Sequence, residues 1–279
     1  MISNIYRVQS LNTMAKYYLH GTLFPHEEDA THEFKGHRKI CQEEIADMNE
    51  KTRKSVSRNI CGFLNTGKGG TVYCGVDDTG IIMGIKLTQY QRDHVVGSLH
   101  DLMSRYTPPV PRDRYTIRFV PVLDSNIPLE RREDLCMYDP KKHVDGQSRK
   151  TLHLFRSRRR CWCDEDAKKM AFECGVIICD YIIEVIVHPW NADQCQGGIG
   201  DLLNVHPIYA DEAGKFYFRR LASLRKYSLY EVTLWAELEA SRRSQELIES
   251  LKNQIKELEL SKDSSRQTSD SDNNDGESY

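Results

Sequence analysis

The sequence predicts an α+β fold, with a mixed or mostly antiparallel sheet, flanking helices and a long C-terminal coiled-coil helix. Three observations lead to this prediction. Up to residue 122, β-branched runs alternate with stretches of helical periodicity. Residues 176–188 form an apolar run rich in Val and Ile, which is typical of a central strand. After Ser228, Leu and Ile recur every three or four residues among Glu, Arg and Lys.

The first half of the chain predicts a strand, a helix and a hairpin, in that order. Apolar residues from Ile40 to Leu64 follow a 3.6-residue period, and the following Asn and Gly residues end the helix. Asp77–Gly80 is a tight-turn sequence between two β-rich runs. The expected elements are a loop that enters a strand over 26–35, a helix at 40–64, a helix stop at 65–70, and hairpin strands at 71–76 and 81–85.

The second half predicts fewer regular elements. A helix at 89–105 is ended by the prolines from Pro108 onward, and residues 115–122 and 215–220 have the composition of strands. The domain boundaries that follow are an N-terminal arm at 1–19, a folded domain at 20–232 with an irregular insertion at 124–170, a coiled-coil helix at 233–260, and a disordered acidic tail at 261–279.

The charge balance is close to neutral but unevenly distributed. The chain of 279 residues has 39 Lys and Arg against 41 Asp and Glu, a net charge of −2. The last 19 residues hold two bases and five acids, which leaves a balance of +1 for the rest. Because the bases of that remainder are clustered, a nucleic-acid partner is not excluded.

Cysteine usage and hydropathy predict the compartment. Nine cysteines occur at irregular spacing, and no apolar run is long enough for a membrane span. We therefore expect an intracellular protein of a reducing compartment, cytoplasmic or nuclear, without a membrane segment.

Three carboxylates are the candidate catalytic and metal-binding residues. Glu28 and Glu33 lie five residues apart, and Asp78 lies in the turn with Asp77. Three carboxylates brought together can bind Mg²⁺ or Mn²⁺, which can activate water for phosphodiester cleavage. The alternative is that the glutamates belong to a solvated acidic turn and that Asp77 and Asp78 only form the hairpin turn.

Basic residues surround this acidic set in the sequence. Such cations can hold phosphates, with Phe155, Trp162 and Tyr217 stacking against bases, although a solvated surface explains most charge runs. The candidate nucleic-acid-binding residues are Lys35, Arg38, Arg58, Arg158, Arg159, Arg160, Arg219 and Arg220, with Arg225 and Lys226 in the last cluster.

Two other motifs predict structure rather than chemistry. The glycines of Gly67–Gly70 follow a helix, whereas those of a P-loop precede one, so a helix stop is the better interpretation than a phosphate cradle. No zinc site is assigned, because one C-x-C pair lacks a second pair at regular spacing and free thiols explain the cysteines better. The residues considered for zinc are Cys136, His143, His153, Cys161 and Cys163.

Several motifs in order resemble the Schlafen family, and more narrowly the AlbA_2-type core domain of Schlafen-like proteins. They are Glu33-Phe34-Lys35, the helix end Phe63-Leu64-Asn65-Thr66-Gly67-Lys68-Gly69-Gly70, and Gly75-Val76-Asp77-Asp78. Phe216–Arg220 is similar to the closing strand of that module, although Leu221-Ala222-Ser223 stands where a Gly-Ser pair often follows.

The resemblance implies a nucleic-acid-binding protein and a metal-dependent endoribonuclease (a hydrolase) that acts on structured RNA such as tRNA, rRNA or a small-RNA precursor. It places the acidic trio of that family on Glu28, Glu33 and Asp78. The alternative is a non-catalytic RNA- or DNA-binding or assembly subunit of a multi-subunit complex. Larger Schlafens carry a zinc site for which this sequence has no recognisable counterpart. They also join two such modules in one chain, so the resemblance implies that this chain forms a homodimer or a hetero-oligomer with a related subunit. The apolar seam at 248–258 is the expected contact between the subunits.

Overall fold

The computed structural model describes residues 17–45, 54–136, 163, 179–191 and 206–271. These residues divide into two units. The first comprises Met1–Trp190 and Ile208–Ser228, and the second comprises Asn191–Pro207 and Leu229–Tyr279. Among the described residues, no helix combines the length and the apolar composition that crossing a bilayer requires.

The first unit is built on one mixed sheet, which confirms the predicted α+β class. Its described strands run in the order β1-β5-β6-β3-β2, and β4 also pairs with β6. The β1–β5 and β2–β3 pairs are parallel, and the pairs with β6 are antiparallel. The strands are β1 (Tyr18–Leu19), β2 (His32–Lys35), β3 (Gly70–Cys74), β4 (Ile85–Leu87), β5 (Tyr115–Leu123) and β6 (Cys179–Val187).

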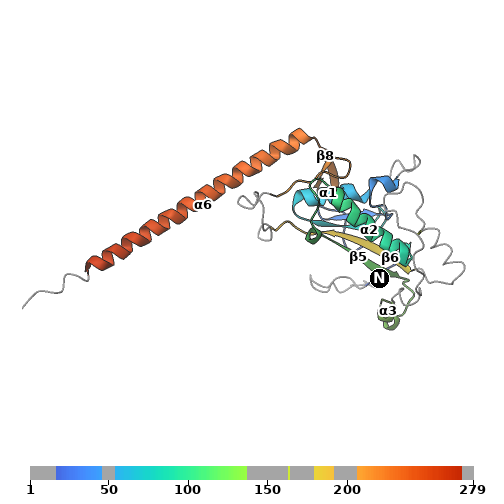
Figure 1. Cartoon of the computed structure of the whole chain (residues 1–279). Helices are drawn as coiled ribbons and strands as arrows, with labels where there is room; N and C mark the ends of the chain where they lie inside the picture. Colours follow the sequence, from blue (N-terminus) through green and yellow to red (C-terminus); the bar gives the residue numbers. More distant parts are fainter. Residues whose placement is uncertain (1–16, 46–53, 137–162, 164–178, 192–205, 272–279) are drawn as a thin grey trace, which may run out of the picture. The chain divides into compact units, whose positions relative to one another are not determined.

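Helices α1 (Val56–Thr66) and α2 (Gln89–Arg105) pack on one face of this sheet (Figure 1). Ile60 and Leu64 of α1 and Leu99 of α2 join the main core with Val72 of β3. Tyr73 lies on the opposite face, because side chains of a strand alternate between its faces, and it belongs to a second apolar cluster.

Both ends of α2 and the C-terminal end of α1 agree with the sequence prediction. Helix α2 has the predicted bounds, and its N-cap Thr88 forms a capping box with Gln91. Gly67 ends α1 in the left-handed conformation, with φ of 69°, so the Gly-rich segment is the predicted helix stop.

Helix α1 begins later than predicted. Instead of continuing a helix from Ile40, the backbone forms a 3-10 turn at η1 (Gln42–Ile45), and α1 begins at Val56. The cause is Glu44, whose Oε2 accepts a hydrogen bond from the Cys41 N–H at 3.1 Å while its Oε1 lies 3.0 Å from His94 Nε2. This carboxylate fixes a turn where periodicity alone predicts helix.

The predicted hairpin is formed only in part. Residues 77–80 do form a turn, and Val76 bridges Ile82, but the following strand pairs with β6 instead of β3. Gly75 is the reason: its carbonyl accepts hydrogen bonds from both Met83 and Gly84, which redirects the chain before β4 begins.

A separate two-stranded hairpin packs against α1. It consists of β7 (Phe216–Arg220), as predicted, and β8 (Ser223–Tyr227), which was not expected from the sequence. Gly62 of α1 faces this hairpin so closely that an added Cβ would lie 2.5 Å from Leu224 Cδ1. The described remainder of the first unit adds η3 (Arg112–Arg114) and α3 (Leu129–Cys136), the latter within the predicted insertion.

The second unit contains the long helix α6 (Leu229–Ser271). It begins at Leu229, four residues before the start predicted at 233, and it continues through 261–271, which the sequence predicts to be part of the disordered tail. Residues 272–279 lie outside the described residues. The coiled coil of α6 stays a prediction.

Candidate functional site

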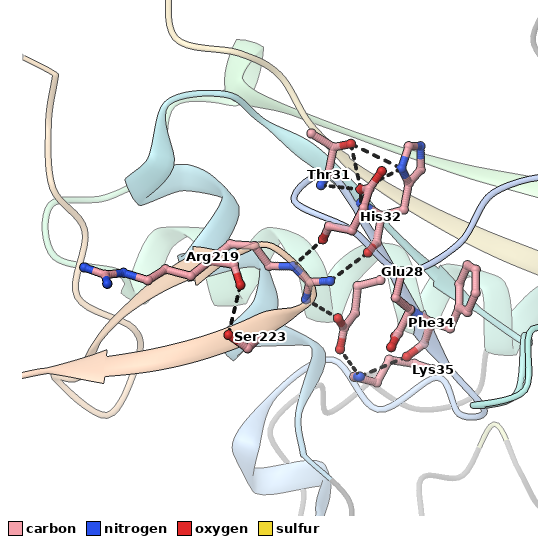
Figure 2. A network of polar contacts seen from close by, with 10 residues as sticks. Glu28, Thr31, His32, Phe34, Lys35, Arg219 and Ser223 are labelled. Carbon is pink, nitrogen blue, oxygen red and sulfur yellow. Dashed lines mark hydrogen bonds and ion pairs between the residues drawn. The ribbon is translucent and has the colours of Figure 1, made fainter.

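Glu33 of β2 lies at the centre of a buried ion cluster. Its two cationic partners, Lys35 and Arg219, are labelled in Figure 2. One carboxylate oxygen pairs with Lys35 Nζ and the other with the Nη1 of Arg219 from β7. Glu33 and Lys35 share one face of the strand because they are two residues apart. The carboxylate therefore faces two cations, and the Arg219 side chain is only 1% exposed.

The guanidinium of Arg219 makes all its polar contacts within the protein. Its Nε donates to the Asp29 carbonyl and its Nη2 to the His32 carbonyl, each at 2.8 Å, while the guanidinium lies 5.3 Å from the centre of the Phe63 ring. The sequence predicts Arg219 to be one of the surface cations that hold phosphate. The structure corrects this, because every nitrogen of the guanidinium has an internal partner.

Glu28 and Asp29 protect the outer edge of β2. Glu28 Oε1 accepts a hydrogen bond from the Phe34 N–H at 2.8 Å, and Asp29 Oδ1 accepts one from the His32 N–H at 2.8 Å. Because β2 is the last strand of the sheet, these N–H groups would otherwise be unpaired. Glu28 thus lies near Glu33 in the chain, yet its carboxylate serves the backbone of the strand.

Asp29 also bonds a histidine. Its Oδ1 lies 2.9 Å from His32 Nδ1. Burial would raise the pKa of Asp29, but hydrogen bonds from Thr31 and His32 lower it to about 2. The His32 ring stacks on His26 with centroids 4.5 Å apart, and burial, together with the charge of His32, lowers the pKa of His26.

Asp77 and Asp78 have different environments. Asp77 Oδ1 accepts hydrogen bonds at 2.9 Å from the Thr79 and Ile81 N–H groups, so this residue forms the turn, as the structural alternative predicted. Asp78 is exposed.

The carboxylate arrangement does not fit a bound Mg²⁺ or Mn²⁺ in this conformation. Glu33 already binds two cationic side chains, and Glu28 is used by a backbone N–H. Within the part of the chain that the structure describes, no group of three or more His, Cys, Asp or Glu is placed to hold a metal. The metal and catalytic roles of Glu28, Glu33 and Asp78 remain a prediction.

The other predicted phosphate-binding residues differ in exposure. Lys35 is held by Glu33, Arg38 is partly buried with interactions of its own, and Arg58 donates to Gln42 Oε1 at 2.9 Å. Tyr217, expected to stack on bases, is buried in the core. Arg158, Arg159 and Arg160, with Phe155 and Trp162, lie outside the described residues.

The exposed bases of the last cluster gather on the β7–β8 hairpin. We call Arg220, Arg225 and Lys226, all exposed, the hairpin cations. The register opposes Phe218 to Arg225 and Tyr217 to Lys226, so Arg220 and Arg225 share one face and Lys226 lies on the other. Arg58 of α1 lies 5.9 Å from the Tyr217 ring centre, on the same side as Lys226.

Residues 28–127 match the family model described as Schlafen, AlbA_2. The chain carries a Schlafen AlbA_2 domain. The match includes Glu28, Glu33 and Asp78 and ends before β6, so Arg219 and the hairpin cations lie beyond it. The family suggests a nucleic-acid-binding domain.

Asn65 is a structural residue of the AlbA_2 domain whose role was not expected from the sequence. Its Nδ2 donates to the carbonyls of Tyr209 and Tyr217 at 2.8 and 3.0 Å, and its Oδ1 accepts the Tyr209 N–H at 2.7 Å. These partners lie about 150 positions away in the chain, so the sequence around Asn65 does not predict the hydrogen bonds. This one buried amide ties α1 to β7.

The described cysteines follow the free-thiol interpretation. Cys41, Cys61, Cys74 and Cys163 are free and buried. Burial raises the pKa of Cys74 to about 12, so this thiol is protonated and inert at neutral pH. Cys136 has a described backbone only, and His143, His153 and Cys161 lie outside the described residues.

Proposed function

We propose that this protein binds RNA through the hairpin cations, without using Glu33 as a catalytic carboxylate. The observation that carries the proposal is the division between two neighbouring arginines. Arg219 is buried on Glu33, whereas Arg220 is exposed on the hairpin. Glu33 is therefore paired with two internal cations, and Arg220, the neighbour of one of them, leaves its positive charge exposed on the hairpin.

The hairpin cations suit a phosphate backbone. Phosphates are bound by Lys and Arg side chains at separate points, without a fixed constellation, and this binding supplies most of the affinity of non-specific complexes. Arg220, Arg225 and Lys226 extend from both faces of a narrow two-stranded hairpin, and Arg58 lies on the side of Lys226. A strand of RNA can contact cations on either face of such a hairpin.

The competing function is the metal-dependent endoribonuclease. It is favoured by the presence of Glu28, Glu33 and Asp78 within the matched segment. For Glu33 to hold a metal, its carboxylate would have to leave both Lys35 and Arg219. Because this conformation does not provide that, binding is the better supported function.

The test is the affinity of the full chain for a fluorescent single-stranded RNA, measured by anisotropy at several salt concentrations. The triple variant Arg220→Ala, Arg225→Ala, Lys226→Ala should bind at least ~10-fold more weakly. The slope of its log affinity against log salt should fall by ~0.7 for each phosphate that the variant no longer neutralises.

The matched control removes the same charge elsewhere. The variant Lys68→Ala, Lys86→Ala, Arg131→Ala also removes three exposed cations. We expect its affinity to change less than ~3-fold, since only long-range attraction is reduced. Equal weakening in both triple variants would show that net charge, rather than the hairpin, determines binding.

A further inference from the structure

Helix α6 has an apolar seam of exposed side chains. Ile248, Leu251, Ile255 and Leu258 repeat at spacings of three and four residues, which are the a and d positions of a heptad. All four side chains are exposed, and Ile255 is 55% exposed. Water contact with aligned Ile and Leu side chains is unfavourable, so the seam is suited to a partner helix.

Ion pairs within α6 mark the opposite face as the solvent side. Arg242 pairs with Glu239 and Glu246, and Arg243 pairs with Glu239 at 2.9 Å. With Ile248 at a, these four residues occupy b, c and f positions, which face away from the seam. Hydrogen bonds from Arg242 and Arg243 lower the pKa of Glu239 to about 2, so the Glu239 carboxylate is charged at neutral pH.

We propose that α6 forms a parallel, in-register, two-stranded coiled coil with α6 of a second copy of this chain. The residue types in the seam favour this parallel, two-stranded pairing. Ile at a with Leu at d is the combination that favours two parallel strands, and Ile248, Leu251, Ile255 and Leu258 follow it without exception.

The flanking positions also favour the parallel orientation. In a parallel pair, g of one helix lies beside e of the next heptad of the other, which brings Leu247 to Lys252 and Gln254 to Glu259. Neither pair opposes like charges, and the Lys252 stem can pack on Leu247. An antiparallel pair that overlays the same four seam residues brings Lys252 beside Lys252 of the second copy, which is repulsive.

The first test is the mass of the full chain in solution without nucleic acid, measured by light scattering over a concentration series. We expect a mass that approaches twice the 32.3 kDa of one chain as concentration rises, because a seam of this length gives a reversible dimer. A mass of one chain throughout would overturn the proposal, and a mass of three chains would overturn the two-stranded arrangement.

A matched pair of variants locates the interface. Ile255→Glu places a charge in the seam and should leave a single chain at every concentration. Leu260→Glu changes a side chain that is 62% exposed at an f position and should dimerise like the wild type. Both keep a good helix former, and circular dichroism confirms that α6 stays folded. Dimerisation of the Ile255→Glu variant would contradict the seam.

Cross-linking tests the orientation. Ser244 lies at a d position, so Ser244→Cys should form an intermolecular disulfide in a parallel pair; the wild type, with its nine cysteines, gives the background. In the antiparallel register, residue 244 lies opposite residue 262 and ~27 Å from its own copy. A disulfide that needs a mixture of Ser244→Cys and Lys262→Cys would overturn the parallel arrangement.

Discussion

The carboxylate of Glu33 and the guanidinium of Arg219 form a buried ion pair that joins β2, inside the AlbA_2 domain, to β7, which lies beyond the matched segment. The pair spans 186 positions of the chain. Glu33, which the sequence predicts to bind a metal, is thus bonded to Arg219. The same pair holds β7, the strand that carries the exposed Arg220.

Removing Arg219 should destabilise the domain strongly. Arg219→Ala leaves Glu33 buried with Lys35 as its remaining cation and removes the donors to two backbone carbonyls. Breaking a buried pair by removing one partner costs about 3–5 kcal/mol, and we expect a decrease of that size in urea unfolding followed by circular dichroism.

The neighbouring arginine is the control for this substitution. Arg220→Ala removes an exposed side chain and should change the free energy of unfolding by no more than ~0.5 kcal/mol. If the two substitutions cost the same, the ion pair does not hold β7 to β2 in solution.

Asn65→Ala should also be costly, for a different reason. It leaves the buried Tyr209 N–H unsatisfied and removes the amide donor to the carbonyls of Tyr209 and Tyr217, which keep only the weak Cys61 thiol donor; an unsatisfied buried group costs about 1–3 kcal/mol. We expect a decrease of about 3 kcal/mol by the same unfolding assay. Thr66→Ala, which removes a partly exposed hydroxyl bonded within its own helix, should cost less than ~1 kcal/mol.

Gly69 should not tolerate a side chain. Its φ is 71°, and an added Cβ would lie 2.4 Å from the Val187 carbonyl oxygen on β6. Gly69→Ala should therefore lower the free energy of unfolding by at least ~2 kcal/mol. Gly36→Ala is the comparison, because no heavy atom lies within 4 Å of its added Cβ. A Gly69→Ala variant as stable as Gly36→Ala would show that the β3–β6 approach is looser than described.

Asp29 should make the edge of β2 sensitive to strong acid. Its pKa falls from 3.8 to about 2 on folding, so its contribution to stability is fully present above pH 3.8 and is lost as pH falls towards 2. The difference in melting temperature between the wild type and Asp29→Asn should therefore narrow between pH 4 and pH 2. A difference that stays constant over this range would mean that the carboxylate is not stabilised by Thr31 and His32.

Elements defined by neighbouring residues were predictable from the sequence. Thr88 caps α2 and Gly67 ends α1, and both act within one helical turn. The sequence could not predict that β4 joins β6 or that Glu44 interrupts the expected helix. Each of those outcomes depends on a partner distant in the chain, such as His94 for Glu44.

The candidate site shows the same limit. The residue types and spacing of Glu28, Glu33 and Asp78 are compatible with metal chemistry, but spacing does not reveal what a carboxylate bonds to. Exposed Arg220 and buried Arg219 are adjacent and of one type, and only the packing of β7 on α1 and β2 distinguishes them. Alternation along β7 predicts opposite faces, yet it does not say which face is buried.

RNA binding without cleavage is tested by following the binding and the length of one labelled RNA in the same samples, in the presence of Mn²⁺. Anisotropy and a denaturing gel are read from the same samples of wild-type protein, the hairpin triple variant and Glu33→Gln. We predict that the wild type binds the RNA and leaves it at full length, while the triple variant does not bind. Shortened RNA with the wild type would contradict the proposed function, and its absence with a Glu33→Gln variant that circular dichroism shows to be folded would make Glu33 catalytic.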